Sequence, residues 1–348
     1  MKKTLLRILS LALTAIMLFS VTACTQEQAT TTVTDVTTNA QADATPDSEL
    51  EIKIYALNGT TALGMAQMID SVNNDTAKMN YDISLHASAD AITGAILTGE
   101  CAIAALPTNV AVKLFNKSQG KLQLLALNTL GVLYLLQNGE DISSLQDLRG
   151  KTIYVPGAGS NPEYITAALL QSAGLKIGTD VEINSTDYPS PDALQGAITA
   201  NKVSLAVLPE PKVTVTTMNN ENVKVALDLT EEWEKVNGEN TLVQGCLVVN
   251  TEFAEQHPAE IKKFLEDYKA SVEFIKEGSD EAIEMIVNAT ILPKAAIAKK
   301  ALPNCNICFI SGDDMKPVMN TFCEKIFNYD KTSIGNALPT DSFYYVAK

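Results

Sequence analysis

Short apolar runs alternate along the chain with segments in which apolar residues recur every three or four positions. The first such unit is LEIKIYALNGTTALGMAQMI, residues 50–69. An apolar run from Ile52 to Leu57 precedes the polar stretch 58–61, and apolar positions then recur with helical spacing. The pattern therefore predicts a strand, a loop and a helix, in that order.

The same order of elements recurs three times further along the chain. The repeats are CAIAALPTNVAVKLF (101–115), KTIYVPGAGSNPEYITAALLQSAGL (151–175) and VSLAVLPEPKVTV (203–215). In the second, Ser160 stands three residues before Glu163, a capping-box pattern, with Pro162 in the first helical turn. Wholly apolar strands that alternate with amphipathic helices predict an α/β fold with parallel sheets covered on both faces.

Two longer extended stretches divide the chain into lobes. They run from Leu124 to Asn138 and from Thr241 to Asn250. A folded body of roughly 300 residues is large enough to split into two lobes. We therefore expect a discontinuous first lobe from residues 50–137 and 245–348, a second lobe from residues 138–244, and two strands that cross between them.

Polar loops follow the predicted strands, and binding residues in α/β sheets lie at the carboxyl ends of strands. Each of these loops also precedes a helix, whose free N–H groups and dipole favour an anion or a polar acceptor. Taken singly, each loop is explained equally well by ordinary turn chemistry. Glu210, between Pro209 and Pro211, is the carboxylate best placed for a site, where it would bind a cation or a ligand N–H, or cap the helix.

Composition and motifs exclude several functions. The net charge of −15 argues against nucleic acid and against adhesion to anionic lipid. No GxSxG, Walker A, HExxH or complete GxGxxG motif is present, and His86 and His257 have no evident partners for a triad, so we expect no enzyme, cofactor or metal site. Beyond Arg7 the only arginine is Arg149, so the cleft lacks an arginine clamp for an anion unless Arg149 reaches it.

Cys305 and Cys308 have CxxC spacing. A zinc site would need two further ligands, and a redox pair would begin a helix, whereas Cys308 leads into a strand-like segment. Free or buried thiols are favoured, a structural disulfide is the alternative, and a metal is the least favoured.

The first residues are typical of an export signal. Positive charges precede an apolar run, Ile8 to Val21, that is too short to span a bilayer well. The run ends in Val21-Thr22-Ala23-Cys24, which resembles the bacterial lipobox and implies removal of residues 1–23 and a lipid anchor on Cys24. A plain secretory signal is the alternative. Residues 24–49 lack aromatic residues and are predicted to be a disordered tether.

Several segments resemble solute-binding components of ABC importers, in the nitrate-, sulfonate-, taurine- and thiamine-precursor-binding group. They are DISSLQDLRGKTIYVPGAGSNPEYITAALLQSAGL (141–175), LVVNTEFAEQHPAEIKKFLEDY (247–268) and the ending SIGNALPTDSFYY, which is similar to clostridial lipoproteins of this set. The resemblance implies a type II periplasmic-binding-protein fold, in which two lobes, each a mainly parallel sheet flanked by helices, are joined by two crossing strands.

The resemblance also implies an extracytoplasmic lipoprotein that captures a small organic solute or anion between its lobes and delivers it to a permease driven by an ATPase. It would be a monomer, held at the outer face of the cell membrane by Cys24. The ligand-binding residues carried over are Asn58, Gly59, Thr60, Thr61, Thr108, Asn109, Asn128, Thr129, Gly159, Ser160, Asn161 and Glu210. Two alternatives stay open: a sensory or partner-binding lipoprotein on the same fold, and an enzyme on that fold.

Overall fold

The computed structural model describes residues 45–347. The predicted signal peptide, Cys24 and the tether up to residue 44 lie outside the described residues. Two of the last residues assigned to the tether contact the folded body. The Asp47 backbone N–H donates to Glu260 Oε1 at 2.9 Å, and Asn80 Nδ2 donates to the Glu49 carbonyl at 3.2 Å. The body therefore begins slightly before residue 50, where the sequence placed it.

The first sheet has six strands in the order β11-β4-β10-β3-β1-β2. Their bounds are β1 (Ile52–Leu57), β2 (Tyr81–His86), β3 (Ile103–Pro107), β4 (Leu122–Leu130), β10 (Val243–Asn250) and β11 (Ile307–Ser311). β1 runs parallel to β2 and β3, whereas β10 is antiparallel to β3 and β4, and β11 is antiparallel to β4. β1, β2, β3 and β4 run in one direction, as expected for a mainly parallel sheet, whereas β10 returns from the second sheet, enters at the carboxyl edge of its neighbours and runs against them.

The second sheet has five strands in the order β7-β6-β8-β5-β9. Their bounds are β5 (Leu133–Asn138), β6 (Thr152–Tyr154), β7 (Glu182–Asn184), β8 (Leu205–Pro209) and β9 (Val223–Asp228). β6 pairs in parallel with β7 and β8, and β5 pairs antiparallel with β8 and β9. β6, β7, β8 and β9 therefore run in one direction, and only β5 of these five strands, which arrives from the first sheet, runs against them.

The extended stretch predicted from Leu124 to Asn138 is made of β4 and β5, which belong to different sheets. The chain crosses at Gly131 and Val132, a few residues before the boundary that the sequence placed after residue 137. The apolar pattern is continuous here, so it marks no break. A side chain at Gly131 would place its Cβ 2.2 Å from Thr230 Oγ1, so this close approach requires glycine. The return crossing is β10, which begins at Val243.

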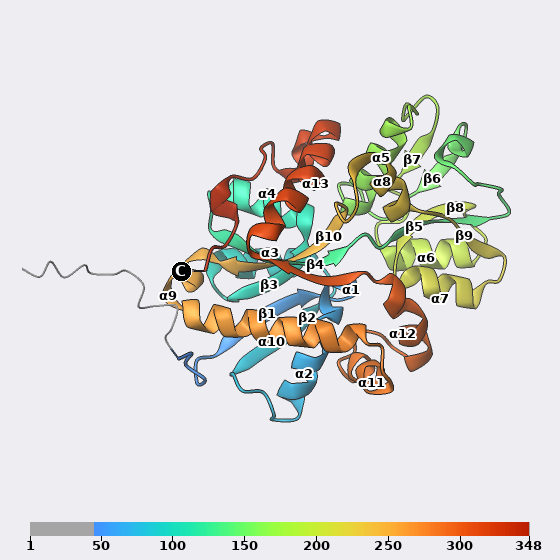
Figure 1. The fold of residues 1–348 in the computed structure, drawn as a ribbon. Coiled ribbons are helices and arrows are strands. Elements are labelled where there is room, and N and C mark those ends of the chain that lie inside the picture. Colours follow the sequence, from blue (N-terminus) through green and yellow to red (C-terminus); the bar gives the residue numbers. More distant parts are fainter. Residues whose placement is uncertain (1–44, 348) are drawn as a thin grey trace, which may run out of the picture. The chain divides into compact units, whose positions relative to one another are not determined.

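Helices cover both faces of each sheet (Figure 1). One face of the first sheet packs against α2 (Ala66–Asn73), α10 (Pro258–Lys276) and α11 (Asp280–Asn288), and the other against α3 (Ala89–Thr98), α4 (Thr108–Ser118) and α13 (Met315–Tyr329). The second sheet packs against α6 (Pro191–Thr199) and α7 (Lys212–Asn219) on one face and against α5 (Asn161–Ser172) and α8 (Leu229–Asn237) on the other. The remaining short helices are α1 (Thr60–Leu63), α9 (Thr251–Gln256), α12 (Ala295–Ala301) and the 3-10 helices η1 (Leu145–Leu148), η2 (Leu302–Asn304), η3 (Gly312–Asp314), η4 (Lys331–Ile334) and η5 (Asp341–Phe343).

Helix α13 joins the lobes through apolar packing. Phe322 of α13 lies 6.1 Å, between ring centroids, from Trp233 of α8, and Tyr329 lies 6.5 Å from Tyr164 of α5. Trp233 and Phe322 are fully buried in one cluster that runs through both lobes. A C-terminal segment assigned to the first lobe therefore also supports the second. Within residues 45–347, no helix has the length and apolar character needed to cross a membrane.

Candidate functional site

The predicted site loops lie at the edges through which the chain crosses. The carboxyl ends of β1, β3 and β4 share one edge of the first sheet, and those of β6, β7 and β8 share one edge of the second. β4 leaves the first edge and β5 enters at the second, because Leu133 is paired with Pro209 at the end of β8. The crossing strand therefore holds the two sets of loops near each other.

A polar contact joins the lobes at this junction. Thr108, the first residue of α4, donates its hydroxyl to the Val243 carbonyl at 2.7 Å and accepts from Asn161 Nδ2 of α5 at 3.3 Å. Both side chains are buried. Since the single hydroxyl proton is used on Val243, Thr108 Oγ1 acts as an acceptor toward Asn161. The orientation of the Asn161 amide is thereby fixed, and its Oδ1 is left buried without a partner.

Asn128, Thr129 and Thr61 form the floor of the junction on the first lobe. Asn128 Nδ2 donates to the Thr61 carbonyl at 3.0 Å, and Thr129 Oγ1 donates to Asn128 Oδ1 at 3.1 Å. A Cβ at Gly245 would lie 2.5 Å from Asn128 Oδ1, so the group packs directly on the β10 backbone. Asn128, which was predicted to contact ligand, thus uses its amide within the protein. Asn109, beside Thr108, is also buried, and its Oδ1 has no partner.

The glycine-rich loop before α5 is closed by its own carboxylate. Gly159 donates its backbone N–H to Glu163 Oε2 at 2.6 Å, and Ser160 Oγ accepts from the Glu163 backbone N–H at 3.3 Å. Ser160 is therefore the N-cap, as the capping-box pattern predicted, but the Glu163 side chain bonds the N–H of Gly159 rather than that of Ser160, so the second bond of the box is not formed. Ser185 donates its hydroxyl to the other Glu163 oxygen. The Gly159 N–H, which was expected to donate to a ligand, is therefore already hydrogen-bonded within the protein.

Glu210 performs the capping role that the sequence left open. Its two carboxylate oxygens accept from the Thr214 backbone N–H at 3.1 Å and from the Thr214 hydroxyl at 2.9 Å, in the first turn of α7. Burial raises the pKa of Glu210, while hydrogen bonds from Thr214 and Asn304 and the charge of Lys300 act in the opposite direction. Asn304 and Lys300 belong to the first lobe, so Glu210 also lies at the lobe junction.

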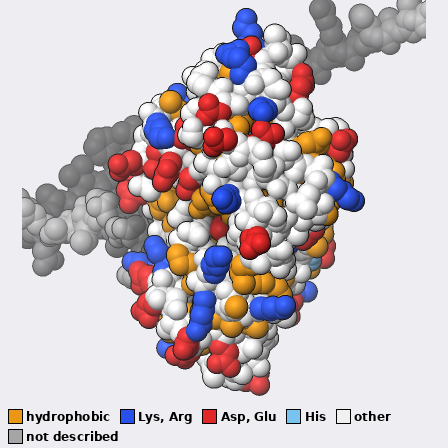
Figure 2. All heavy atoms as spheres, turned by 90° about the vertical axis from the view of Figure 1, so that its right-hand side faces the viewer, with side chains coloured by type: hydrophobic (Ala, Val, Ile, Leu, Met, Phe, Trp, Pro, Cys, Tyr) orange, Lys and Arg blue, Asp and Glu red, His pale blue; other side chains and the backbone are white. Residues whose placement is uncertain are grey.

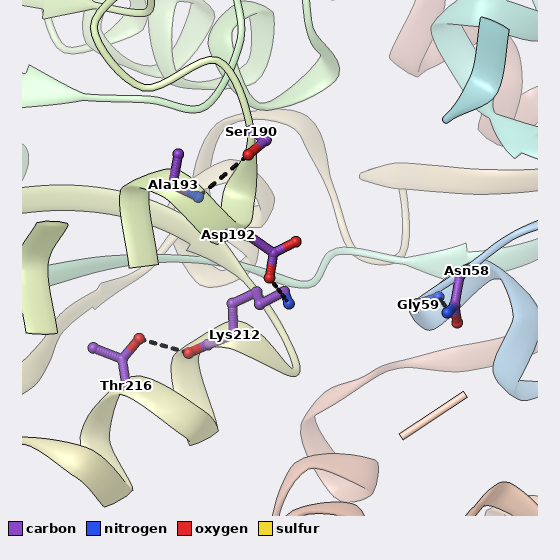
Figure 3. Close-up of polar contacts among 7 residues, drawn as sticks. All are labelled: Asn58, Gly59, Ser190, Asp192, Ala193, Lys212 and Thr216. Atoms are coloured by element: carbon purple, nitrogen blue, oxygen red, sulfur yellow. Dashed lines mark hydrogen bonds and ion pairs between the residues drawn. The ribbon is translucent and has the colours of Figure 1, made fainter. Parts of the chain in front are cut away.

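The outer part of the junction is more open. Asn58 is exposed, with its Oδ1 accepting from the Gly59 backbone N–H at 2.8 Å, and Gly59 has φ of 119°, a conformation that favours glycine. Thr60, the next residue and the start of α1, is half-buried. Figure 3 shows Asn58 on one side and the side chains of Asp192 and Lys212 extending toward it from α6 and α7. Asp192 and Lys212 form an ion pair.

Asp192 and Lys212 were missed by the sequence reasoning. A signal for Asp192 was available, because Ser190 and Pro191 repeat the polar cap followed by proline that opens α5. Ser190 Oγ indeed accepts from the Ala193 backbone N–H at 3.2 Å. No comparable signal marks Lys212, whose backbone carbonyl receives the Thr216 hydroxyl at 2.7 Å within α7.

Arg149 does not reach this junction. Its guanidinium pairs with Asp180, and both residues precede the strands β6 and β7, at the amino edge of the second sheet. Within the described chain, then, no arginine is available to the predicted site.

The cysteines of the described chain are buried, and a cavity lies close to the junction. Burial raises the pKa of the Cys101 and Cys308 thiols to about 12, and all five cysteines from residue 45 onward are buried and unpaired. Among the residues that the structure describes, no cluster of metal-ligating side chains is present. A cavity of about 550 Å³ lies beside the first crossing, lined by residues that include Leu130, Lys276, Lys299 and Asn306.

The fold is that of the two-lobed periplasmic binding proteins, as the resemblance in the sequence predicted. A protein described as an ABC transporter from Parabacteroides distasonis has a TM-score of 0.71 at 23% identity, over 87% of this chain and 100% of that one. The periplasmic aliphatic sulphonate binding protein SsuA of Escherichia coli has a TM-score of 0.69 at 13% identity, over 86% and 92%. The alkanesulfonate-binding protein SsuA of Xanthomonas axonopodis pv. citri, bound to MOPS, has a TM-score of 0.63 at 13% identity, over 85% and 96%.

A family model described as "NMT1/THI5 like" matches residues 120–282. This stretch contains both crossings and the whole second sheet. It also contains most of the segments on which the sequence resemblance was based. A search among curated proteins found no significant match.

Proposed function

We propose that the protein is the extracytoplasmic solute-binding component of an ABC importer. The observation that carries the proposal is the meeting of buried polar side chains from two lobes, Thr108 and Asn161, at the edge where the crossing strands join the sheets. Binding proteins of this architecture take small solutes between their lobes. The similar structures, which are described as an ABC transporter and as sulfonate-binding proteins, support the same role.

In this function the lobes close over a small organic solute or anion, and the closed form delivers it to a membrane permease with its ATPase. Thr108, Asn109 and Asn161 are the residues that we assign to solute contact at the junction. Asn58, Gly59 and Thr60 form the outer rim on the first lobe. Thr61, Asn128, Thr129, Gly159, Ser160 and Glu210 are assigned a supporting role, because their polar groups are engaged within the protein. Neither catalysis nor a cofactor is part of this proposal.

We further propose that Cys24 carries the lipid anchor and that the protein acts as a monomer at the outer face of the cell membrane. The lipobox-like sequence Val21-Thr22-Ala23-Cys24 supports the anchor. Two acyl chains hold a protein stably, each contributing about 0.8 kcal/mol per buried CH₂. Mass spectrometry of the N-terminal peptide tests this part, since an unmodified N-terminus after Ala23 would contradict it.

Solute binding is tested with Thr108→Ala and Asn161→Ala. A thermal-shift screen of the purified protein against sulfonates, nitrate, purines, pyrimidines, amino acids and short peptides first identifies a ligand. At about 100 times its Kd, a ligand adds roughly 2.7 kcal/mol to the free energy of unfolding. Both variants should then bind it more weakly while staying folded, whereas Asn222→Ala, an exposed position on the second lobe, should bind normally. Normal binding by both junction variants would place the site elsewhere.

The partner-binding alternative depends on the surface. Figure 2 shows one face on which acidic and basic side chains are interspersed and apolar side chains gather low in the view, between lysines. The large hydrophobic side chains that are most exposed in the described residues lie on separate elements: Met218, Val225, Val236, Leu338 and Val346. A pull-down that yields a protein partner, together with no response to any solute, would favour this alternative.

A further inference from the structure

The junction presents acceptors that the protein leaves unpaired. Asn161 Oδ1 and Asn109 Oδ1 are buried without partners, on residues that are 6% and 3% exposed. The Asn161 oxygen is fixed as an acceptor by the bond from its Nδ2 to Thr108 Oγ1. A buried acceptor without a donor is unfavourable, so it indicates a partner that comes from outside the chain. That partner has to supply N–H or O–H groups.

At three helix starts of the second lobe, one N–H group is already taken by a side chain of the protein. The Glu163 carboxylate takes the Gly159 N–H before α5, and the Glu210 carboxylate takes the Thr214 N–H in α7. At α6, Ser190 caps the Ala193 N–H. Two of these three groups are carboxylates, and their negative charge opposes an anion at the same helix starts.

The lysines at the junction interact with acidic residues. Lys212 forms an ion pair with Asp192, and Lys300 acts on Glu210. With Glu163 included, the acidic side chains exceed the lysines here, and Arg149 lies at the opposite edge of the sheet, paired with Asp180. An anionic solute would therefore meet like charge without a cation reserved for it.

We propose that the solute is neutral or cationic and presents N–H donors to Asn161 Oδ1 and Asn109 Oδ1. This inference rests on the proposed solute-binding function and narrows it, because it excludes sulfonate-like anions as the main ligand. The donors of an amide, amine, amidine or amino-substituted ring would satisfy the two buried oxygens from the two lobes together. Closure would then pair the two unpaired acceptors through one molecule.

Two sets of probes of similar size test the proposal by thermal shift and calorimetry on the purified protein. The first set holds butanesulfonate, ethanesulfonate and nitrate, and the second holds agmatine, putrescine, nicotinamide and cytosine. We expect stabilisation by a member of the second set and not of the first. Asn161→Ala and Asn109→Ala should each lower the affinity for that probe about tenfold or more, as expected for loss of a buried hydrogen bond.

Asn161→Asp separates charge from hydrogen bonding. The aspartate keeps an acceptor oxygen and adds a negative charge, so a cationic probe should keep at least half of its wild-type affinity. Asn161→Asp also serves as a second variant of the site if Asn161→Ala does not fold. Asn222→Ala is the matched control and should leave the affinity unchanged.

The outcomes distinguish this inference from the function on which it rests. Tight binding of butanesulfonate that depends on Asn161 would overturn the proposed solute class and leave the solute-binding function standing. Silence from every probe of both sets would overturn the inference, whereas the solute-binding function is overturned only if the wider screen of solutes described above also gives no ligand. A donor-bearing probe whose affinity is unaffected by either asparagine variant would overturn the assigned contacts.

Discussion

The contact between Thr108 and Asn161 can be tested by removing one hydroxyl. Thr108→Val keeps the shape of the side chain but leaves the Val243 carbonyl and the Asn161 Nδ2 group without their partner. The bond to Val243, at 2.7 Å, has the ideal length for O–H···O, and the Asn161 bond, at 3.3 Å, is longer and weaker. An unsatisfied buried group costs about 1–3 kcal/mol, so we expect a loss of about 2–3 kcal/mol in the free energy of unfolding.

Urea denaturation of the solute-free protein measures this loss, with Thr166→Val as the matched control. Thr166 is also buried, but its hydroxyl donates to the Pro162 carbonyl one turn back in α5, at 2.8 Å. That carbonyl also serves the helix, so the control should lose only about 1 kcal/mol or less.

A double-mutant cycle then shows whether the lobes meet in solution. Thr108→Val and Asn161→Ala should be coupled by roughly 0.5–1 kcal/mol, because they share one hydrogen bond. A loss at Thr108 no larger than that of the control, together with additive effects in the double variant, would refute the reasoning. The two lobes would then be separate at this point in the solute-free protein.

Three further predictions concern the same region and its core. Gly245→Ala should destabilise the protein by about 1–3 kcal/mol, because its Cβ would clash with Asn128 Oδ1. Gly196→Ala, in open space on α6, should instead stabilise the protein by up to about 1 kcal/mol. Urea denaturation measures the free energy of unfolding of both variants, and equal effects would contradict the packing at Gly245. The raised pKa of Glu210 means that the folded state binds the carboxyl proton more tightly than the unfolded state does, so the contribution of Glu210 to the free energy of unfolding falls as pH rises through the acidic range. The stability of Glu210→Gln relative to wild type should therefore rise with pH. A difference in stability that does not change with pH would contradict the burial of Glu210. The buried thiols should not react with a thiol reagent until the protein unfolds. Fast labelling of the native protein would contradict their burial. The thiols concerned are those of Cys101, Cys246, Cys305, Cys308 and Cys323.

The order of elements around the site could be predicted because it depends on local patterns. The four strand-loop-helix units at Asn58, Thr108, Ser160 and Glu210 all occur as expected, since strand and helix periods and the Ser160 N-cap act over a few residues. The helix from Pro258 to Lys276 begins with proline in its first turn, which is another local signal.

The directions of strands and the exact crossing point needed the tertiary structure. β4 and β5 form one apolar stretch in the sequence, and the strand pairings, together with the close approach of Thr230 to Gly131, show where the chain leaves one sheet for the other. The packing of Phe322 on Trp233 joins residues that are far apart along the chain, so no periodicity could indicate it.

By itself, the sequence determined the α/β class, the two lobes and the loops that meet between them, because hydrophobic period and turn chemistry are properties of neighbouring residues. Only the tertiary structure decided which polar groups in those loops are still free. The carboxylates of Glu163 and Glu210 accept hydrogen bonds from the N–H groups of Gly159 and Thr214, whereas Asn109 and Asn161 each have an unpaired side-chain oxygen. Hydrogen bonding is decided by which groups meet in space, and the Thr108–Asn161 contact joins residues that are 53 positions apart in the chain.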